Sequence, residues 1–409
     1  MTAALERAGT ARASVPSAPP PDAALVTLLV LAACEPTNTP LRWLTDDSAA
    51  RWWYQVALWT FALLVALADG RGLRAALRSP ARWLLFTGVW MMAVSPFGLV
   101  PHLDLATAAG FTAYVLAGAA VVDGGGWPRL RAALFPASAV LLVVSALTEL
   151  SGIGGSRWFG VFRDPNALAF GCVVAALCGI DRWMRGGRQG LLLAASALPI
   201  LVLTDGRIAM AALAVGVAAL LRPALPPAIL PLALVAVCTG VVLLAANDSL
   251  GERASRSVSR SGESEEIRTL TGRTGIWEIA LDEVRDRPVT GIGAGSTTEV
   301  YTVAEEQDRI GFVVTHGHDL WVQLALSGGV VAVLLVLLGS LEFAVRARIR
   351  PVRDRDALML ALFVHGITED VMAEPRFTVI VAAAAFAATA PRRARLRQLR
   401  RRRSRTPSP

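Results

Sequence analysis

Charged residues are scarce in this sequence and make up 18% of its 409 residues, whereas soluble domains usually carry about a quarter. The four cysteines lie in or beside apolar runs without metal-ligand spacing, which predicts that they pack in the interior. The chain also lacks internal repeats, a Walker motif and a GxGxxG sequence. ATP hydrolysis and dinucleotide chemistry therefore have no residues to support them.

Hydrophobic residues make up 54% of the chain and fall in blocks rather than stripes. A dozen runs of roughly 15–24 residues are apolar on all sides, the length that a helix needs to cross a bilayer. Because backbone groups in lipid must bond to one another, these runs are predicted to be helices. We expect an all-α polytopic membrane protein with about 12 transmembrane helices. The predicted spans are 23–34, 52–69, 82–100, 104–122, 131–149, 165–183, 189–204, 207–222, 226–247, 319–345, 356–372 and 376–390.

Polar segments divide the chain into five parts. Residues 1–22, rich in Ala, Pro and Ser, predict a disordered tail without the features of a signal peptide. Nine spans follow within 23–247, and the last three lie within 318–390. Residues 248–317 form one large polar loop, a length that is uncommon unless the loop is functional or disordered. Residues 391–409 form a basic tail.

Arginine supplies all 40 basic residues of the chain. Its clusters follow spans two, four, six and ten and recur in the C-terminal tail, which places all five on one side if twelve spans are right. The positive-inside rule assigns that side to the cytoplasm, so both termini are expected there and the large loop outside. The tail, with nine arginines, predicts an anchor for anionic membrane lipids rather than a nucleic-acid arm.

One part of the large loop, TGRTGIWEIALDEVRDRPVTGIGAGS, predicts an amphipathic helix. Thr274 is suited to cap its start and Pro288 to end it. We expect this helix to lie on the membrane surface or over the mouth of the bundle. The residues predicted to form its apolar face are Ile276, Trp277, Ala280, Leu281 and Val284.

Arg273 stands just before the predicted helix. Free N–H groups, the positive end of the helix dipole and a guanidinium together favour a bound phosphate. The alternative is a solvated arginine that pairs with Glu278 or another neighbour. The spacing favours neither interpretation over the other.

A second charged feature is the turn Thr204-Asp205-Gly206-Arg207, flanked by two apolar runs of about 15 residues. Helices of that length span less than the hydrocarbon core, so the turn is expected to lie below the outer surface. Ionisable groups at such depth usually face a bundle interior or a wet cavity. The alternative is a local Asp205–Arg207 pair that reaches the headgroups.

The stretch GGSRWFGVFRDPNALAF leads into the sixth span. Asp164 is suited to cap that helix, and Pro165 fits its first turn. Arg157 and Arg163 stand near aromatic residues, which interfacial anchoring explains. The outside face carries few other basic residues, so these two arginines are also candidates to converge with Arg207 and Arg273 on one anion.

Two of the four histidines lie in THGHDLWVQLALSGG, where the large loop meets an apolar run. His316 and His318 suggest a metal pair, but no third ligand stands out. A histidine at this boundary can be neutral near pH 7 and accept a proton; alternatively, it is a polar interfacial residue or a helix cap. The last outside loop carries charged residues expected to pair among themselves: Glu369, Asp370, Glu374 and Arg376.

Four pieces of the sequence, taken in order, resemble the O-antigen ligase and O-antigen polymerase superfamily of bacterial membrane glycosyltransferases. They match its arginine, glycine and Pro-Asn helix entry, its Thr-x-Ser-Arg-Gly turn, its Gly-Arg, Trp, Pro, Gly-x-Gly loop, and its histidine followed ten residues on by glycine. The pieces are RWFGVFRDPNALA, LTDGRIAMAALAV, GRTGIWEIALDEVRDRPVTGIGAGS and HDLWVQLALSGG. The resemblance covers roughly residues 150–345.

The resemblance implies a GT-C-like bundle that acts at the outer face of the cytoplasmic membrane. The expected donor is an undecaprenyl-diphosphate-linked oligosaccharide, whose glycan is transferred or polymerised onto a hydroxyl of a glycan or lipid acceptor. The family needs no metal and no cofactor. Membrane lipids and other polysaccharide-assembly proteins are the further expected partners, and nucleic acid is not expected.

The resemblance also implies roles for individual residues. His318 would be the general base, while Arg207 and Arg273 would hold the donor diphosphate and steady the leaving group. The residues expected to contact the substrates are Arg157, Arg163, Asn166, Asp205 and Trp277.

The sequence departs from the family pattern at two positions. Gly206 stands where serine is usual, and Asp319 stands where asparagine usually follows the histidine. Ligase and polymerase share these motifs, so the acceptor stays open. The main alternative function is a 12-helix secondary transporter of a small anionic solute, which predicts a repeat and broken helices. A non-catalytic scaffold for polysaccharide assembly is a further alternative.

Overall fold

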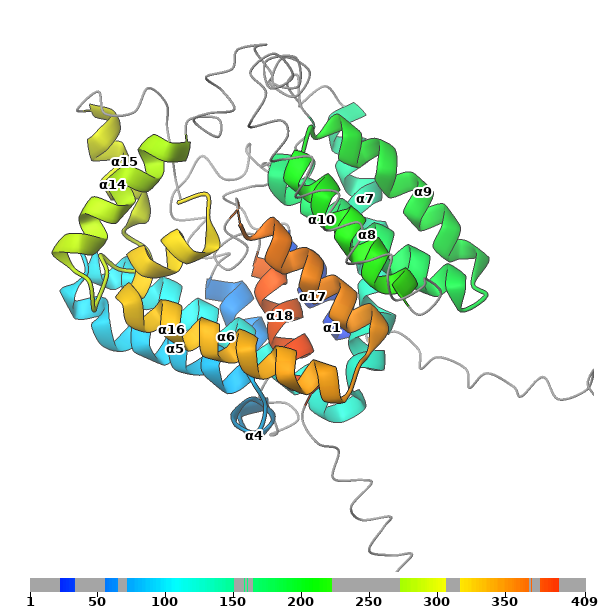
Figure 1. Cartoon of the computed structure of the whole chain (residues 1–409), viewed down its shortest axis with the longest axis horizontal. Helices are drawn as coiled ribbons and strands as arrows, with labels where there is room; N and C mark the ends of the chain where they lie inside the picture. The colour runs from blue at the N-terminus through cyan, green and yellow to red at the C-terminus, as the bar shows by residue number, and fades with distance from the viewer. Residues whose placement is uncertain are drawn as a thin grey trace, which may run out of the picture.

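The computed structural model describes residues 23–33, 56–64, 72–150, 158, 160, 165–222, 273–306, 317–367, 369 and 376–389. Every regular element in these residues is helical, as the apolar runs predicted (Figure 1). The elements are α1 (Ala23–Ala33), α4 (Gly72–Leu77), α5 (Ala81–Val94), η4 (Ser95–Phe97), α6 (Pro101–Gly125), α7 (Trp127–Leu150), α8 (Pro165–Met184), α9 (Arg188–Leu203), α10 (Arg207–Leu221), α14 (Arg273–Asp286), α15 (Thr297–Glu306), α16 (Leu320–Ile349), α17 (Arg353–His365) and α18 (Arg376–Ala387).

Four helices are long and apolar enough to cross a membrane: α7, α8, α16 and the Pro101–Val121 part of α6. Shorter apolar helices include α1, α9 and α10. These lengths and compositions indicate a membrane protein. The predicted span 226–247 lies outside the described residues, so the count of twelve stays a prediction.

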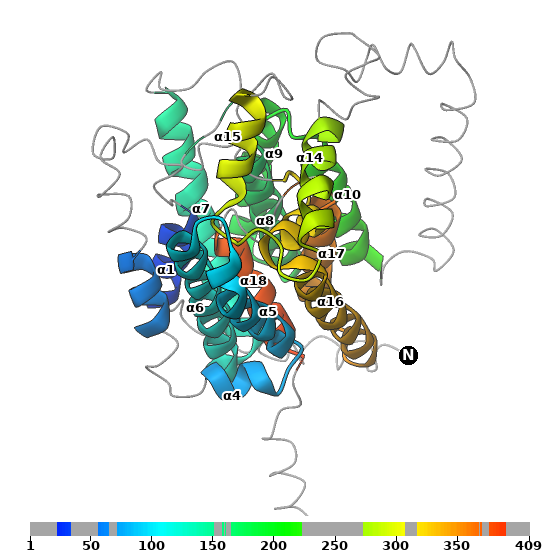
Figure 2. The ribbon, with the colours of Figure 1, turned by 90° about the vertical axis from the view of Figure 1, so that its left-hand side faces the viewer.

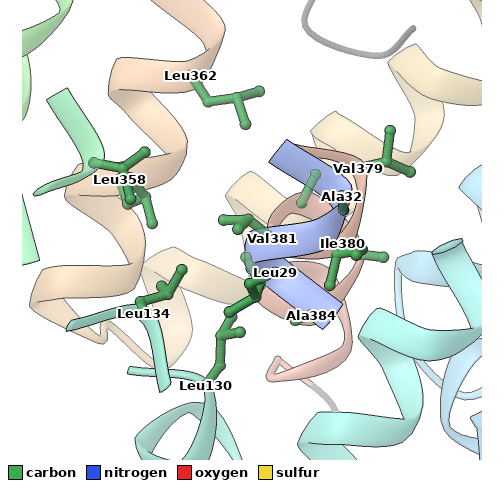
Figure 3. Packing of buried hydrophobic residues seen from close by; sticks show 14 of the residues in the cluster. Leu29, Ala32, Leu130, Leu134, Leu358, Leu362, Val379, Ile380, Val381 and Ala384 are labelled. Atoms are coloured by element: carbon green, nitrogen blue, oxygen red, sulfur yellow. The ribbon is translucent and has the colours of Figure 1, made fainter. Parts of the chain in front are cut away.

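The middle of the bundle is built from small and branched side chains. Leu29 of α1, Leu130 of α7, Leu358 of α17 and Val381 of α18 are among the residues that meet there (Figure 3). Helix α18 also packs closely against α6, where a side chain on Gly118 would collide with the backbone of α18. Small residues allow such close approach, which is a main source of helix association within membranes.

Charged groups tie several helices together at one end of the bundle. The indole of Trp127 donates to Asp354 at 2.7 Å, and Arg131 lies 3.4 Å from the same carboxylate. Arg185 binds Asp181 at 2.8 Å and lies 3.7 Å from Asp354. Both carboxylates are nearly buried. The starts of α7 and α17 therefore meet the end of α8 through paired charges.

Other arginines join this end. Arg346, near the end of α16, binds Glu342 at 2.6 Å and reaches the carbonyl of Arg78 beyond α4. Arg353, the first residue of α17, donates to the carbonyl of Leu220 at the end of α10. The arginine-rich connections therefore gather at the end of the bundle where α4 lies, opposite α14 and α15 (Figures 1 and 2).

Helix α16 is broken, although its apolar run predicted one continuous helix. Gly328 and Gly329 have non-helical backbone angles, and Gly329 has φ +65°. The residues that follow α14 form hydrogen bonds with the backbone at this break. Ile292 N–H donates to the Leu326 carbonyl at 2.7 Å, and Val330 N–H donates to the Pro288 carbonyl at 2.8 Å. The groups freed by the break are thus paired within the protein, as an apolar setting requires.

Replacing Gly329 by Ala tests this junction, with Gly186→Ala as the control. Both glycines have positive φ, which costs another residue about 1–2 kcal/mol, but a Cβ at Gly329 would collide with the Val289 carbonyl whereas Gly186 faces open space. We expect the midpoint of thermal unfolding in detergent to fall clearly more for Gly329→Ala. Equal losses in the two variants would contradict the junction.

Candidate functional site

Helices α14 and α15 pack against the start of α16 and form a small second core (Figure 2). This agrees with the placement of the amphipathic helix over the bundle rather than on an open surface. Helix α15 was not predicted. Burial raises the pKa of the Tyr301 hydroxyl on α15, so that side chain stays neutral. The buried residues of this core are Ile276, Ile279, Ala280, Ile292, Val300, Tyr301, Ala304 and Leu326.

The predicted apolar face of α14 was wrong at one position. Leu281 is 47% exposed, and Ile279 is buried in its place. Residues three and four after Ile276 share its face of a helix, whereas the fifth points away. Helix α14 begins at Arg273, one residue before the predicted cap Thr274, and ends before Pro288 as predicted.

Gly317, the residue before His318, is held by hydrogen bonds that involve α14, α15 and α16. The indole N–H of Trp277 on α14 donates to the Gly317 carbonyl at 3.0 Å. The Gly317 N–H donates to the side chain of Gln323 on α16 at 2.9 Å, and the Gln323 amide donates to Thr297 on α15 at 3.0 Å. The loop helices thus position the histidine segment. Gln323 was not predicted to take part, because its role depends on contacts between distant elements.

His318 stands in a left-handed backbone conformation, with φ +48°. The carboxylate of Asp319 caps α16 by accepting the N–H groups of Trp321 and Val322, both at 2.8 Å. The imidazole Nδ1 lies 3.4 Å from Oε2 of Glu369. The side chain of His318 is 22% exposed and that of Glu369 is 6% exposed. A partly exposed imidazole therefore lies beside a buried carboxylate. The structure places Glu369 against His318. The side chains of Asp370, Glu374 and Arg376, with which Glu369 was expected to pair, lie outside the described residues.

The start of α16 lies beside the end of α17. Leu320 N–H donates to the Gly366 carbonyl at 3.0 Å, and the adjacent His365 stacks on Phe170 of α8 with ring centroids 4.8 Å apart. Asn166 lies in the first turn of α8, which begins at Pro165 as predicted. His318 and Asn166 therefore belong to one end of the bundle, opposite the arginine-rich connections.

The turn between α9 and α10 belongs to this same end, because α10 runs antiparallel to α17. Asp205 has φ +53°, and its Oδ1 lies 3.7 Å from Nε of Arg207. Both side chains are more than a third exposed. The structure thus contains the local pair that was one of the two expected arrangements. At Gly206, where the family usually has serine, a side chain would collide with Ala169 of α8, so glycine lets the turn lie against that helix.

A buried carboxylate holds the loop that follows α14 in the chain. The sequence did not predict this contact. Asp104 of α6 is fully buried and accepts from the Ser296 hydroxyl at 2.9 Å and the Gly295 N–H at 2.8 Å. A side chain on Gly293, which has φ +114°, would collide with this carboxylate. An acidic residue in an apolar span needs hydrogen-bond partners within the protein. The position of Asp104 in a predicted span could therefore have indicated such a contact.

Some predicted site residues are described only in part or not at all. Arg157, Arg163 and His316 lie outside the described residues, and the structure describes the backbone of Arg273 alone. Within the described part of the chain, no group of three His, Cys, Asp or Glu side chains is arranged to hold a metal ion.

Residues 191–337 match the family model Wzy_C, described as O-antigen ligase. This part of the chain therefore resembles an O-antigen ligase domain. The matched residues begin in α9 and end in the second half of α16. They include Arg207, Trp277 and His318 but not Glu369. The match confirms the family resemblance. No curated protein matches the chain.

Changing Trp277 to Phe tests how α14 positions the segment that contains His318. The ring keeps most of its packing but loses the N–H that holds Gly317, a bond worth about 0.5–1.5 kcal/mol. We expect faster hydrogen–deuterium exchange over residues 317–323, measured by mass spectrometry. Trp183→Phe, at a half-exposed position of the opposite end, is the control. Unchanged exchange in Trp277→Phe would contradict this role.

Proposed function

We propose that this protein transfers or polymerises a glycan from an undecaprenyl-diphosphate-linked donor onto an acceptor hydroxyl, outside the cytoplasmic membrane. The observation that supports it most is the placement of His318. The loop helices hold this imidazole partly open at the end of the bundle that also carries Arg207, within the part of the chain that resembles an O-antigen ligase domain. An oriented base and a guanidinium are the groups that metal-free transfer from a diphosphate requires.

In the proposed step, the acceptor hydroxyl gives its proton to His318 as its oxygen attacks the anomeric carbon of the donor glycan. The bond between that carbon and the diphosphate oxygen breaks, and undecaprenyl diphosphate leaves. Arg207 and Arg273 stabilise the negative charge that grows on the leaving group. Arg157, Arg163 and Asn166 are proposed further substrate contacts, together with Asp205 and Trp277.

Arg207 is suited to this role because its present partner holds it weakly. An exposed ion pair is usually worth about 0–1 kcal/mol, and the 3.7 Å separation from Asp205 is long. A diphosphate carries more charge than one carboxylate and accepts two parallel bonds from a guanidinium. The donor can therefore replace Asp205 at little cost.

The charge distribution supports an extracytoplasmic site. The arginine-rich connections gather at the end opposite His318, and the positive-inside rule places such connections in the cytoplasm. The N- and C-terminal tails would then also be cytoplasmic.

The broken helix α16 is the one observation that favours the alternative, a secondary transporter of a small anionic solute, because broken helices form transporter sites. In this chain, however, the Leu326 carbonyl accepts from Ile292, and the Gly328 carbonyl accepts from the indole of Trp90 at 2.7 Å. These groups bind the protein itself, which favours a rigid junction over a solute site.

Deleting the gene and analysing polyprenyl-linked intermediates tests the proposed function. A polymerase should leave single lipid-linked repeats, whereas a ligase should leave long lipid-linked chains. Restoring the His318→Ala protein should not restore the surface glycan, since a general base contributes about 10²–10⁴-fold. His102→Ala, at an exposed histidine, is the control and should restore it. Full restoration by an inserted His318→Ala protein would refute the proposed base.

Arg207→Ala tests the diphosphate contact. Loss of one charge-stabilising group typically costs about 10²–10³-fold in rate, and we expect a loss of that size in transfer from a purified lipid-linked donor. Arg207→Lys should keep the charge and recover part of the rate. The control is Arg285→Ala, which removes an arginine that is 76% exposed on α14. Equal rates for Arg207→Ala and the control would count against this contact.

A further inference from the structure

Helices α8 and α9 pack side by side as a hairpin whose tip lies at the arginine-rich end of the bundle (Figure 1). The two helices meet closely at this tip, where a side chain on Gly190 would collide with the backbone of α8. The tip exposes Arg182, Arg185 and Arg188, together with Trp183. Arginine and tryptophan are enriched where transmembrane helices leave the membrane, so this tip has the composition of a surface that meets lipid headgroups.

Two arginines at this end are already matched by carboxylates. Arg131 and Arg185 each lie within 2.8–3.9 Å of both Asp181 and Asp354. The two carboxylates are nearly buried, and a buried charge is costly without such partners. These four residues therefore form a group without net charge that serves the packing of the helices.

Arg182 is held by neutral groups instead. Its guanidinium lies 4.3 Å from the ring centroid of Phe135 on α7, and its Nη2 donates to the side chain of Gln189 on α9 at 2.9 Å. Among the residues that the structure describes, no carboxylate lies within 4.0 Å of Arg182 or Arg188. The tip therefore carries two positive charges that the protein does not neutralise, and one of them is fixed in place.

An exposed apolar surface begins within one turn of these charges. Leu191 and Leu192 follow Arg188 by three and four residues, which places all three on one face of α9. Together with Leu198 and Val202 further along the helix, the two leucines are 48–70% exposed. Exposed apolar side chains on a membrane helix contact acyl chains. A ligand that fits this face combines a negative headgroup with fatty chains.

We propose that the α8–α9 tip binds an anionic phospholipid of the leaflet on the arginine-rich side, with Arg182 and Arg188 as the residues that hold its headgroup. The lipid phosphate accepts hydrogen bonds from the two guanidinium groups, and the acyl chains lie along Leu191 and Leu192. Basic residues beside transmembrane helices bind headgroups of this kind. The site lies at the end of the bundle opposite His318 and does not depend on the proposed function.

Native mass spectrometry of the purified full-length protein tests this site, with phosphatidylglycerol as the probe. One arginine near an anionic lipid contributes about fivefold in affinity, so the first bound phosphatidylglycerol should bind about 25-fold more weakly to the double variant Arg182→Gln, Arg188→Gln. The matched control, Arg74→Gln with Arg348→Gln, removes two exposed arginines from other parts of the same end and should leave the affinity unchanged. An equal loss in the control would show a diffuse attraction and overturn the site.

Two further ligands establish whether the site takes a lipid of this charge. Phosphatidylcholine, which has no net charge, should bind more weakly than phosphatidylglycerol to the unaltered protein and should not distinguish it from the double variant. Inorganic phosphate should fail to displace phosphatidylglycerol at a similar concentration, because it lacks the acyl chains that contact Leu191 and Leu192. Displacement by phosphate, or equal binding of the two lipids, would overturn the proposal.

Hydrogen–deuterium exchange of the unaltered protein covers the case in which the double variant does not fold. In bilayer discs, phosphatidylglycerol should slow exchange over residues 182–190 relative to phosphatidylcholine. Residues 273–286, which form α14 at the opposite end, should exchange at the same rate in both lipids. Exchange at the tip that does not differ between the two lipids would overturn the proposal.

Discussion

A break in an apolar helix frees backbone groups, and in a membrane protein those groups must find partners within the chain. This requirement governs the structure around α16. The stretch after α14 lies in the break at Gly328 and Gly329 and supplies both donors and acceptors. Asp104 fixes the same stretch to α6 from the other side. The large loop is therefore joined to the bundle through its backbone as well as through apolar side chains.

This junction explains how a loop segment can carry a precise site. Helices α14 and α15 rest on the first half of α16, and from there Trp277 and Gln323 hold Gly317. His318 therefore takes its position from three packed elements. The base that we propose at His318 would need such fixed geometry, because the gain from an oriented base is lost when reacting atoms are displaced by about an ångström.

Much of the fold follows from the sequence because long apolar runs in lipid can only be helices. Helix starts with a local cause, such as the Pro165 start of α8, were also predictable. The break at Gly329 was not, because glycine is common in membrane helices and its partner segment lies about 40 residues earlier. The same holds for Glu369, which sequence proximity assigned to its own loop. Contacts that join distant segments have no local pattern.

The two ends of the bundle use charge differently. At the arginine-rich end, nearly buried Asp181 and Asp354 are bound by arginines and an indole from several helices. Breaking such pairs is costly because it leaves a buried charge alone, so this end is suited to hold helices together. At the other end, Arg207 has an exposed carboxylate at 3.7 Å. Exposed pairs exchange partners cheaply, which supports the proposal that Arg207 binds an incoming anion.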